Sequence, residues 1–296
     1  MWLLAAAILA ACSPAPSSSG NGVAVVATTT QVGEVAGEIG GDDIRLTVLL
    51  SPGAEAHDFE MKPAAAAAIE RAEIILESGA GLEAWLEGAL TTIGGANKVR
   101  DMSAGVALRS PDVGEEGDVD PHYWLSAPNA IVLVENVRDA LSEAQPASAQ
   151  AFADRAAAYV ARLEDADAEI RGLIDEIPED RRGIVTNHDA LGYFIDEYGL
   201  RFVGSVFPAV DVEAEPDPRQ LAELADTIRA EGVTAIFSES AVNPRLAEAI
   251  AAETGATVVE EPLYTDSLGP AGSGADTIDG MLLHDARVIH HALGDG

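Results

Sequence analysis

Short apolar segments alternate with helical segments along most of the chain, and this alternation constrains the fold more than any other feature. Apolar or β-branched runs bounded by turn residues predict strands, and amphipathic stretches between them predict helices. The first part of the chain has such strands at 23–30, 44–50 and 72–79, with helices at 63–71 and 82–91. Strands that alternate with helices form parallel sheets. We therefore predict an α/β fold built from parallel-sheet βα units.

One long helix interrupts this alternation. Apolar residues recur at helical spacing from Ala149 to Ile177, where there is no internal proline. After Pro178 the alternation begins again, and a final helix is predicted at 276–293. The pattern predicts two α/β lobes joined by a long helix. The predicted parts of the chain are a leader and tether at 1–22, an N-terminal lobe at 23–146, a connecting helix at 147–178 and a C-terminal lobe at 179–296.

The first 22 residues are typical of an exported protein. An apolar run ends in Leu9-Ala10-Ala11-Cys12, which resembles a bacterial lipobox, and a Ser/Pro/Gly-rich tether follows. Cys12 is the only cysteine, so no intramolecular disulfide can form, and its position favours lipidation. We predict a periplasmic or extracytoplasmic protein that is held to the membrane by this lipid anchor alone. The alternative is a plain signal peptide with an incidental Cys12.

The chain is strongly acidic. Its 50 Asp and Glu residues outnumber 17 Lys and Arg residues, which gives a formal net charge of −33. Such a surface repels phosphate backbones, so we expect no nucleic-acid partner. A negative potential attracts cations, but it is equally typical of a solvated acidic surface suited to salty surroundings.

Three of the six histidines follow predicted strands or stand at the start of a predicted helix. His57 lies in SPGAEAHDFEMKP, His122 in VDPHYWL and His188 in IVTNHDALGYF. Ligands of open parallel sheets bind beyond the carboxyl ends of the strands. Imidazole is the commonest side-chain ligand of transition metals, and three imidazoles with one carboxylate complete a four-coordinate shell. These positions predict a metal site shared by the two lobes.

Two carboxylates are candidates for the fourth ligand. Asp266 lies in EPLYTDSLGP after the last predicted strand, and Glu239 in FSES is the second choice. Asp189 is suited either to orient an imidazole or to cap a helix. Around His122, Asp120-Pro121 directs the chain, and we expect Tyr123 and Trp124 to pack beneath an outward-pointing imidazole. The remaining histidines lie on the final helix, and we read the last two as exposed surface: His284, His290 and His291.

A catalytic zinc site is an alternative of another class. A zinc hydrolase would use the metal to activate water, with Glu239 or Glu60 as general base. The chain has no HExxH, no GxSxG and no Gly-rich phosphate loop. We therefore expect a protein that is not an enzyme.

Five ordered motifs resemble those of the zinc/manganese substrate-binding proteins of bacterial ABC importers. They are PGAEAHDFEMKP, DPHYWLSAPNA, NHDALGYFIDEYGL, EAEPDPRQLAEL and LYTDSLG, and the likeness runs from Val23 to the C-terminus. The resemblance implies two lobes joined by one long rigid helix, with a metal in the inter-lobe cleft. It implies ligands His57 and His122 from the first lobe, and His188 and Asp266 from the second. The implied partners are an ABC permease and its ATPase, with a metal chaperone as a further candidate, and we expect a monomer.

The choice of metal rests on two departures from the family pattern. Members of the manganese and iron type tend to have Glu where His188 stands, and a third imidazole favours Zn²⁺ over Mn²⁺. Zinc-specific members often carry a His-rich loop before the second ligand motif. This chain instead has a short acidic loop there, with Asp112, Glu115, Glu116, Asp118 and Asp120. The loop is either a solvated turn or a segment that gathers metal ions. We predict a Zn²⁺ receptor, with Mn²⁺ or Fe²⁺ as the alternative cargo. A metal-stabilised adhesin with this fold is the other alternative.

Overall fold

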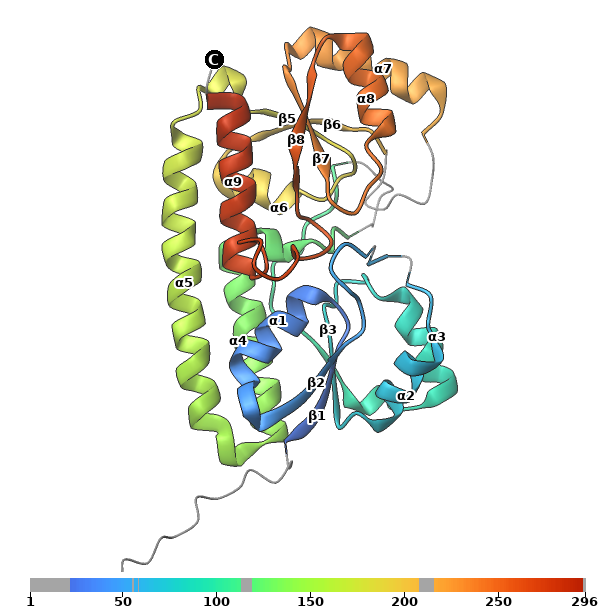
Figure 1. Ribbon diagram of the computed structural model, residues 1–296, viewed down its shortest axis with the longest axis vertical. Helices are drawn as coiled ribbons and strands as arrows, with labels where there is room; N and C mark the ends of the chain where they lie inside the picture. Colours follow the sequence, from blue (N-terminus) through green and yellow to red (C-terminus); the bar gives the residue numbers. More distant parts are fainter. Residues whose placement is uncertain (1–21, 55, 58, 113–118, 208–215, 295–296) are drawn as a thin grey trace, which may run out of the picture.

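Each lobe of the computed structural model is built on one four-stranded sheet (Figure 1). The structure describes residues 22–54, 56–57, 59–112, 119–207 and 216–294. The N-terminal sheet has the order β2-β1-β3-β4 and contains β1 (Val23–Ala27), β2 (Ile44–Val48), β3 (Ile74–Glu77) and β4 (Val99–Asp101). The C-terminal sheet has the order β6-β5-β7-β8 and contains β5 (Gly183–Thr186), β6 (Arg201–Ser205), β7 (Ala235–Glu239) and β8 (Thr257–Leu263). All neighbouring strands pair in parallel, so the two lobes repeat one topology and the α/β prediction is confirmed.

Helices cover both faces of each sheet. Around the N-terminal sheet lie α1 (Thr30–Gly40), α2 (Pro63–Arg71), α3 (Ala84–Ile93) and α4 (Ala127–Ala144). The remaining helices are α5 (Ala149–Asp175), α6 (Gly192–Tyr198), α7 (Pro218–Glu231), α8 (Arg245–Thr254) and α9 (Ile278–Gly294). A short 3-10 turn, Tyr123–Leu125, precedes α4. No helix in these ranges is both long and apolar enough to cross a bilayer.

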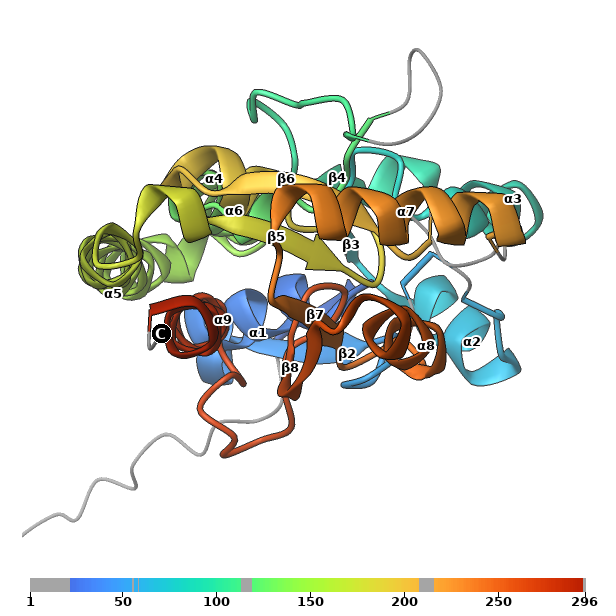
Figure 2. The ribbon, with the colours of Figure 1, turned by 90° about the horizontal axis from the view of Figure 1, so that it is seen from above.

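The 27-residue helix α5 runs beside both lobes (Figure 1). At 1.5 Å per residue it is about 40 Å long, which is enough to support both sheets. Its buried side chains recur every three or four residues, as expected for a helix with one apolar face: Phe152, Ala156, Tyr159, Leu163, Ala166, Ile170 and Ile174. Figure 2 shows α9 alongside α5, so the end of the chain packs against the connecting helix.

The two lobes share one apolar core on the side of these long helices. This core runs from β1 and β3 through α4 and α5 to α6, β7 and α9. The opposite faces of the sheets have their own smaller cores, under α2 and α3 in the first lobe and under α7 and α8 in the second. Because burial of apolar area is the main stabilising contribution to folding, a shared core resists separation of the lobes.

Candidate metal site

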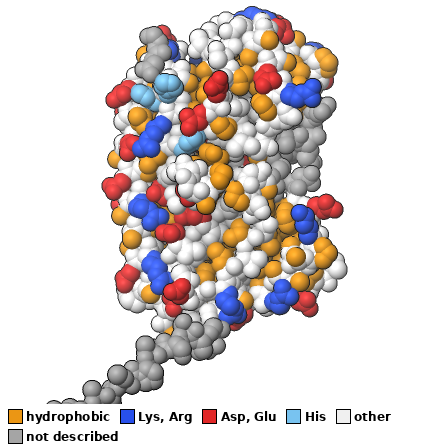
Figure 3. Space-filling model, viewed as in Figure 1, with side chains coloured by type: hydrophobic (Ala, Val, Ile, Leu, Met, Phe, Trp, Pro, Cys, Tyr) orange, Lys and Arg blue, Asp and Glu red, His pale blue; other side chains and the backbone are white. Residues whose placement is uncertain are grey.

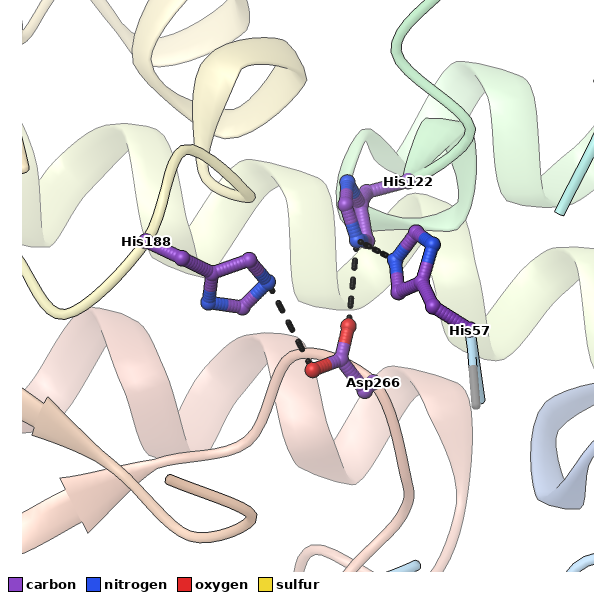
Figure 4. Close-up of side chains that lie close together, drawn as sticks. All are labelled: His57, His122, His188 and Asp266. Carbon is purple, nitrogen blue, oxygen red and sulfur yellow. Dashed lines mark hydrogen bonds and ion pairs between the residues drawn. The ribbon is translucent and has the colours of Figure 1, made fainter. Parts of the chain in front are cut away.

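Four side chains converge between the lobes (Figure 4). His57 comes from the segment between β2 and α2, and His122 directly precedes the 3-10 turn before α4. His188 follows β5, and Asp266 follows β8. One ligand atom from each residue lies within 4.8 Å of the others. The structure therefore brings together the four residues that the sequence singled out, two from each lobe.

The distances within this group fit a small metal shell. Nε2 of His57 lies 3.3 Å from Nε2 of His122, which lies 3.0 Å from Oδ1 of Asp266. Nε2 of His188 lies 3.5 Å from Oδ2 of Asp266. A tetrahedron with zinc–ligand bonds of about 2.0–2.1 Å has edges of about 3.3 Å. These three contacts are thus close to the edge length of a tetrahedral zinc shell, while the whole group spans up to 4.8 Å.

Three of the four side chains are closed off from solvent. His122 and His188 are 0% exposed and Asp266 is 1% exposed, while His57 is half-buried. The sequence predicts an imidazole of His122 that points outward into a cleft; in the structure the lobes close over it. Nε2 of His188 and Oδ2 of Asp266 are buried and face each other at 3.5 Å, a distance at which they form an ion pair but no hydrogen bond within the described residues. Buried polar atoms without a good hydrogen bond are costly, and a metal ion bound to both atoms would satisfy them.

Asp120 orients His122. Its Oδ1 accepts a hydrogen bond from the backbone N–H of His122 at 3.0 Å and lies 2.8 Å from Nδ1 of that imidazole. This contact leaves Nε2 facing the group. Tyr123 and Trp124 are fully buried below, as the sequence predicts, and Trp124 Nε1 donates to the carbonyl of Thr265 at 2.9 Å.

Glu239 holds His188 in a similar way. Its Oε1 accepts from the backbone N–H of His188 at 2.9 Å, and its Oε2 lies 2.7 Å from Nδ1 of the ring. Oε2 also accepts a hydrogen bond from the hydroxyl of Thr265 at 2.7 Å. Glu239 is therefore not one of the four converging residues, but it holds His188 and also Thr265, which precedes Asp266.

The loop that carries Asp266 is bonded to the N-terminal lobe. Gln31 Nε2 donates to the carbonyl of Thr265 at 3.2 Å, and Leu268 N–H donates to the hydroxyl of Thr30 at 2.9 Å. Gly53 N–H donates to the hydroxyl of Ser267 at 2.8 Å. Asp266 thus belongs to the C-terminal lobe in sequence and is fixed by both lobes in space.

Electrostatics favour protonated histidines around one carboxylate. Burial disfavours the charged imidazolium, but contacts with Asp120 and Asp266 raise the pKa of His122 to about 9. Against the same effect of burial, Glu239 and Asp266 raise the pKa of His188 well above its usual value. Burial opposes ionisation of Asp266, yet the two imidazoles hold its pKa well below its usual range. A metal that binds here therefore displaces protons.

The other candidates lie apart from the group. Glu60 is exposed, and Asp189 is buried next to His188 but does not join the four. His284 contacts the carbonyl of Pro262. His290 lies 3.0 Å from a Glu176 oxygen, and its side chain is 26% exposed, so the predicted exposure is only partial there, whereas His291 is exposed. Several predicted positions lie outside the described residues, namely Cys12 with the tether, Glu115, Glu116 and Asp118.

Sequence reasoning missed Arg109 and Thr265. Arg109 Nη1 donates to Oδ2 of Asp120 at 3.0 Å, and Thr265 joins Glu239 to the Asp266 loop. One signal for Arg109 was available, because it is the only Lys or Arg between Arg100 and Arg138. Thr265 carries no comparable signal, since it lies in the loop after β8 and its partner Glu239 is 26 residues away at the end of β7.

Comparisons with known proteins agree with this architecture. The profile of the family described as "Zinc-uptake complex component A periplasmic" matches residues 25–292. The manganese-binding lipoprotein MntA of Bacillus subtilis (strain 168) is 33% identical over 288 residues, which cover 94% of this chain and 92% of that protein. The iron-binding protein YfeA of Yersinia pestis is 32% identical over 253 residues, which cover 86% of this chain and 80% of that protein.

A solved structure gives the same result. The periplasmic zinc-binding protein TroA from Treponema pallidum superposes with a TM-score of 0.84 at 28% identity and covers 91% of this chain and 98% of its own. The chain therefore belongs to the zinc-uptake complex component A family, whose members are extracytoplasmic substrate-binding receptors of metal ABC importers and not enzymes.

Proposed function

We propose that this receptor captures Zn²⁺ with His57, His122, His188 and Asp266 and delivers it to the permease and ATPase of a metal ABC importer. The observation that carries the proposal is the closed set of three imidazole nitrogens and one carboxylate within 4.8 Å. Nitrogen-rich four-coordinate sets suit Zn²⁺, whereas Mn²⁺ prefers more oxygen ligands and a higher coordination number. Cys12 would anchor the receptor to the membrane, as the word lipoprotein in the names of relatives suggests.

The surrounding carboxylates support this role. Asp120 and Glu239 each contact Nδ1 of one histidine, which leaves Nε2 for the metal and makes the imidazole a more basic ligand. A buried site removes the ion from its water shell, which costs free energy. The negative charge of Asp266 compensates that cost. Since the ligands come from both lobes, movement of one lobe against the other changes the shell, and docking to the permease would trigger release.

A Mn²⁺ receptor is the second candidate. Asp266 directs Oδ1 towards His122 and Oδ2 towards His188, so both oxygens are available to one ion. A bidentate carboxylate raises the number of donors to five and the oxygen share with it, which suits Mn²⁺ better than a monodentate one. The name of MntA from Bacillus subtilis points in the same direction.

Calorimetric titration of the metal-stripped protein with Zn²⁺ and, separately, with Mn²⁺ tests the proposal. We expect one tight zinc site, weaker manganese binding, and a loss of zinc affinity in His188→Ala greater than the roughly 10–100-fold typical of residues behind a ligand. His291→Ala, which removes a histidine outside the group, is the matched control and should bind as the wild type does. If Mn²⁺ binds more tightly than Zn²⁺, the transported ion is Mn²⁺ and not Zn²⁺. If neither ion binds tightly, the proposed receptor function is refuted.

A further inference from the structure

Arg109 contacts both lobes from one position. It lies between β4 and the 3-10 turn that follows His122, in the N-terminal half of the chain. Its Nη1 donates to Oδ2 of Asp120 at 3.0 Å, and its Nε donates to Oδ2 of Asp196 on α6 at 2.9 Å. The guanidinium carbon also lies 5.8 Å from the ring centroid of Tyr193 on α6. One side chain therefore links the segment before His122 to the helix that follows His188.

Asp120 passes this constraint to His122. Asp120 is fully buried, and its two oxygens are divided between two partners: Oδ1 faces His122 and Oδ2 faces Arg109. Backbone contacts reinforce the arrangement, because Asp120 N–H donates to the carbonyl of Arg109 and the Tyr193 hydroxyl donates to the carbonyl of Asp120. Rotation of the carboxylate would break the Arg109 contact and the His122 contact together.

Gly192 shows how closely α6 packs on this pair. A Cβ at Gly192 would lie 1.6 Å from Nη1 of Arg109 and 2.8 Å from Oδ2 of Asp120. No side chain fits there unless the guanidinium moves. Since Gly192 is the first residue of α6 and follows His188 by four positions, the Arg109–Asp120 pair lies where the two ligand-bearing segments meet.

We propose that Arg109 is a positioning residue for metal binding, which fixes the imidazole of His122 through Asp120 and makes its orientation depend on the packing of α6. The inference rests on the proposed function, because it requires His122 to be a ligand. An arginine suits the role because its planar guanidinium donates in several fixed directions at once, which a lysine ammonium does not.

A double-mutant cycle tests this chain of contacts. Arg109→Gln should weaken zinc binding about 10-fold or more, as expected for a residue behind a ligand. In an Asp120→Asn background the same substitution should cost little further affinity, because the route to His122 is already broken. Arg109→Lys should fall between wild type and Arg109→Gln. Arg138→Gln is the matched control: it removes a guanidinium paired with carboxylates on the outside of α4 and should leave affinity unchanged.

Gly192→Ala approaches the same contact from the other side and retains Arg109. Gly192→Ala should also weaken zinc binding. Thermal unfolding of the metal-free variants shows whether each one folds. If Arg109→Gln does not fold, the zinc affinity of Gly192→Ala tests the proposal in its place. The visible spectrum of the Co²⁺-loaded protein should change in Arg109→Gln and in Gly192→Ala, because both substitutions move the donor nitrogen of His122. It should stay the same in Arg138→Gln.

Two results would overturn the inference while leaving the function intact. One is wild-type zinc affinity in a folded Arg109→Gln variant. The other is an equal loss of affinity with and without Asp120→Asn, which would mean that Arg109 acts independently of Asp120. If the wild-type protein itself binds neither Zn²⁺ nor Mn²⁺, the proposed function fails, and the inference fails with it.

Discussion

At the scale of single residues, His122 and His188 share one arrangement. A buried carboxylate contacts Nδ1 of each ring and also accepts a hydrogen bond from the backbone N–H of the same histidine, Asp120 for His122 and Glu239 for His188. Two contacts to one residue fix both the backbone and the ring. Each imidazole therefore presents Nε2 in a set direction, which limits the geometries that a bound ion can adopt.

Replacing His188 by Glu should change the preference between metals. The substitution exchanges a nitrogen ligand for oxygen, so we expect zinc affinity to fall and the ratio of manganese to zinc affinity to rise. Competitive titration of the two ions measures that ratio. His291→Glu, the same change outside the group, should leave it unaltered. An unaltered ratio in His188→Glu would show that His188 does not contact the metal.

The Thr265 hydroxyl should matter more than its methyl group. Thr265→Val retains the shape but leaves Oε2 of buried Glu239 without its hydroxyl donor, which costs about 1–3 kcal/mol of unfolding free energy. Zinc binding should weaken about 10-fold because Glu239 then holds His188 less firmly. Thr265→Ser keeps the donor and should bind zinc nearly as the wild type does. Urea unfolding and zinc titration of the pair check both effects, and equal behaviour of the two variants would contradict them.

At the scale of elements, α1, α5 and α9 meet around Glu34. Glu34 Oε2 accepts a hydrogen bond from the Tyr159 hydroxyl on α5 at 2.5 Å, and that hydroxyl accepts from Ile278 N–H at the start of α9 at 3.2 Å. Arg162 of α5 pairs with Asp279 on α9 at 3.4 Å and with Glu38 on α1 at 3.5 Å. The connecting helix is thus tied to the first and last helices through side chains.

This junction predicts a pH dependence of stability. Burial raises the pKa of Glu34 from 4.5 to about 8, even though the Tyr159 hydrogen bond lowers it. Between these values the folded protein keeps a proton that the unfolded chain releases, so unfolding free energy should fall as pH rises, by at most about 1.4 kcal/mol per unit. Urea unfolding of the metal-free proteins between pH 5 and 8 measures this dependence. The unfolding free energy of the wild type should fall more steeply with pH than that of Glu34→Gln. Glu164→Gln, on the exposed face of α5, should match the wild type. Parallel curves for wild type and Glu34→Gln would contradict the assignment.

Local pattern explains which elements the sequence predicts. The predicted bounds of α2 coincide with the observed ones, and α5 ends within two residues of its prediction, because helical periodicity marks these segments. The three-residue β4 and the seven-residue α6 were not predicted, since neither is long enough to show a period. The lobe boundaries remain predictions.

The site divides in the same way. The ligand candidates follow strands or precede a helix, so sequence position identifies the three histidines and offers Asp266 and Glu239 for the fourth ligand, while the family resemblance implies the set with Asp266. The contacts that hold them join segments remote in sequence, such as Gln31 with Thr265, and no local spacing records such pairs. The roles of His57, His122, His188 and Asp266 as ligands remain predictions, as do the lipid anchor at Cys12 and the monomeric state.

At the scale of the whole molecule, acidic side chains outnumber basic ones by about three to one, 50 against 17. Figure 3 shows acidic and basic groups interspersed on one face, yet the chain as a whole carries a net charge of −33. Mutual repulsion of like charges destabilises a compact state, and salt screens it over distances of about 10 Å at 0.1 M. The fold therefore depends on its ionic surroundings.

Raising NaCl from low to molar concentration should increase the melting temperature of the metal-free protein. A variant with Glu164→Lys and Asp165→Lys, two exposed positions of α5, has a smaller net charge and should show a smaller increase. Differential scanning calorimetry measures both. A melting temperature that is independent of salt would mean that local ion pairs offset the repulsion.

The position of α9 joins the two ends of the chain. This last helix packs on α5 and touches α1, and Leu268 just before it bonds to Thr30 across 238 residues of chain. Complete packing of the N-terminal lobe therefore requires segments that lie more than 200 residues further along the chain. Such long sequence separations also slow folding. For a receptor that works outside the cytoplasmic membrane, we expect this order of elements to leave the N-terminal lobe incompletely packed for as long as α9 is absent.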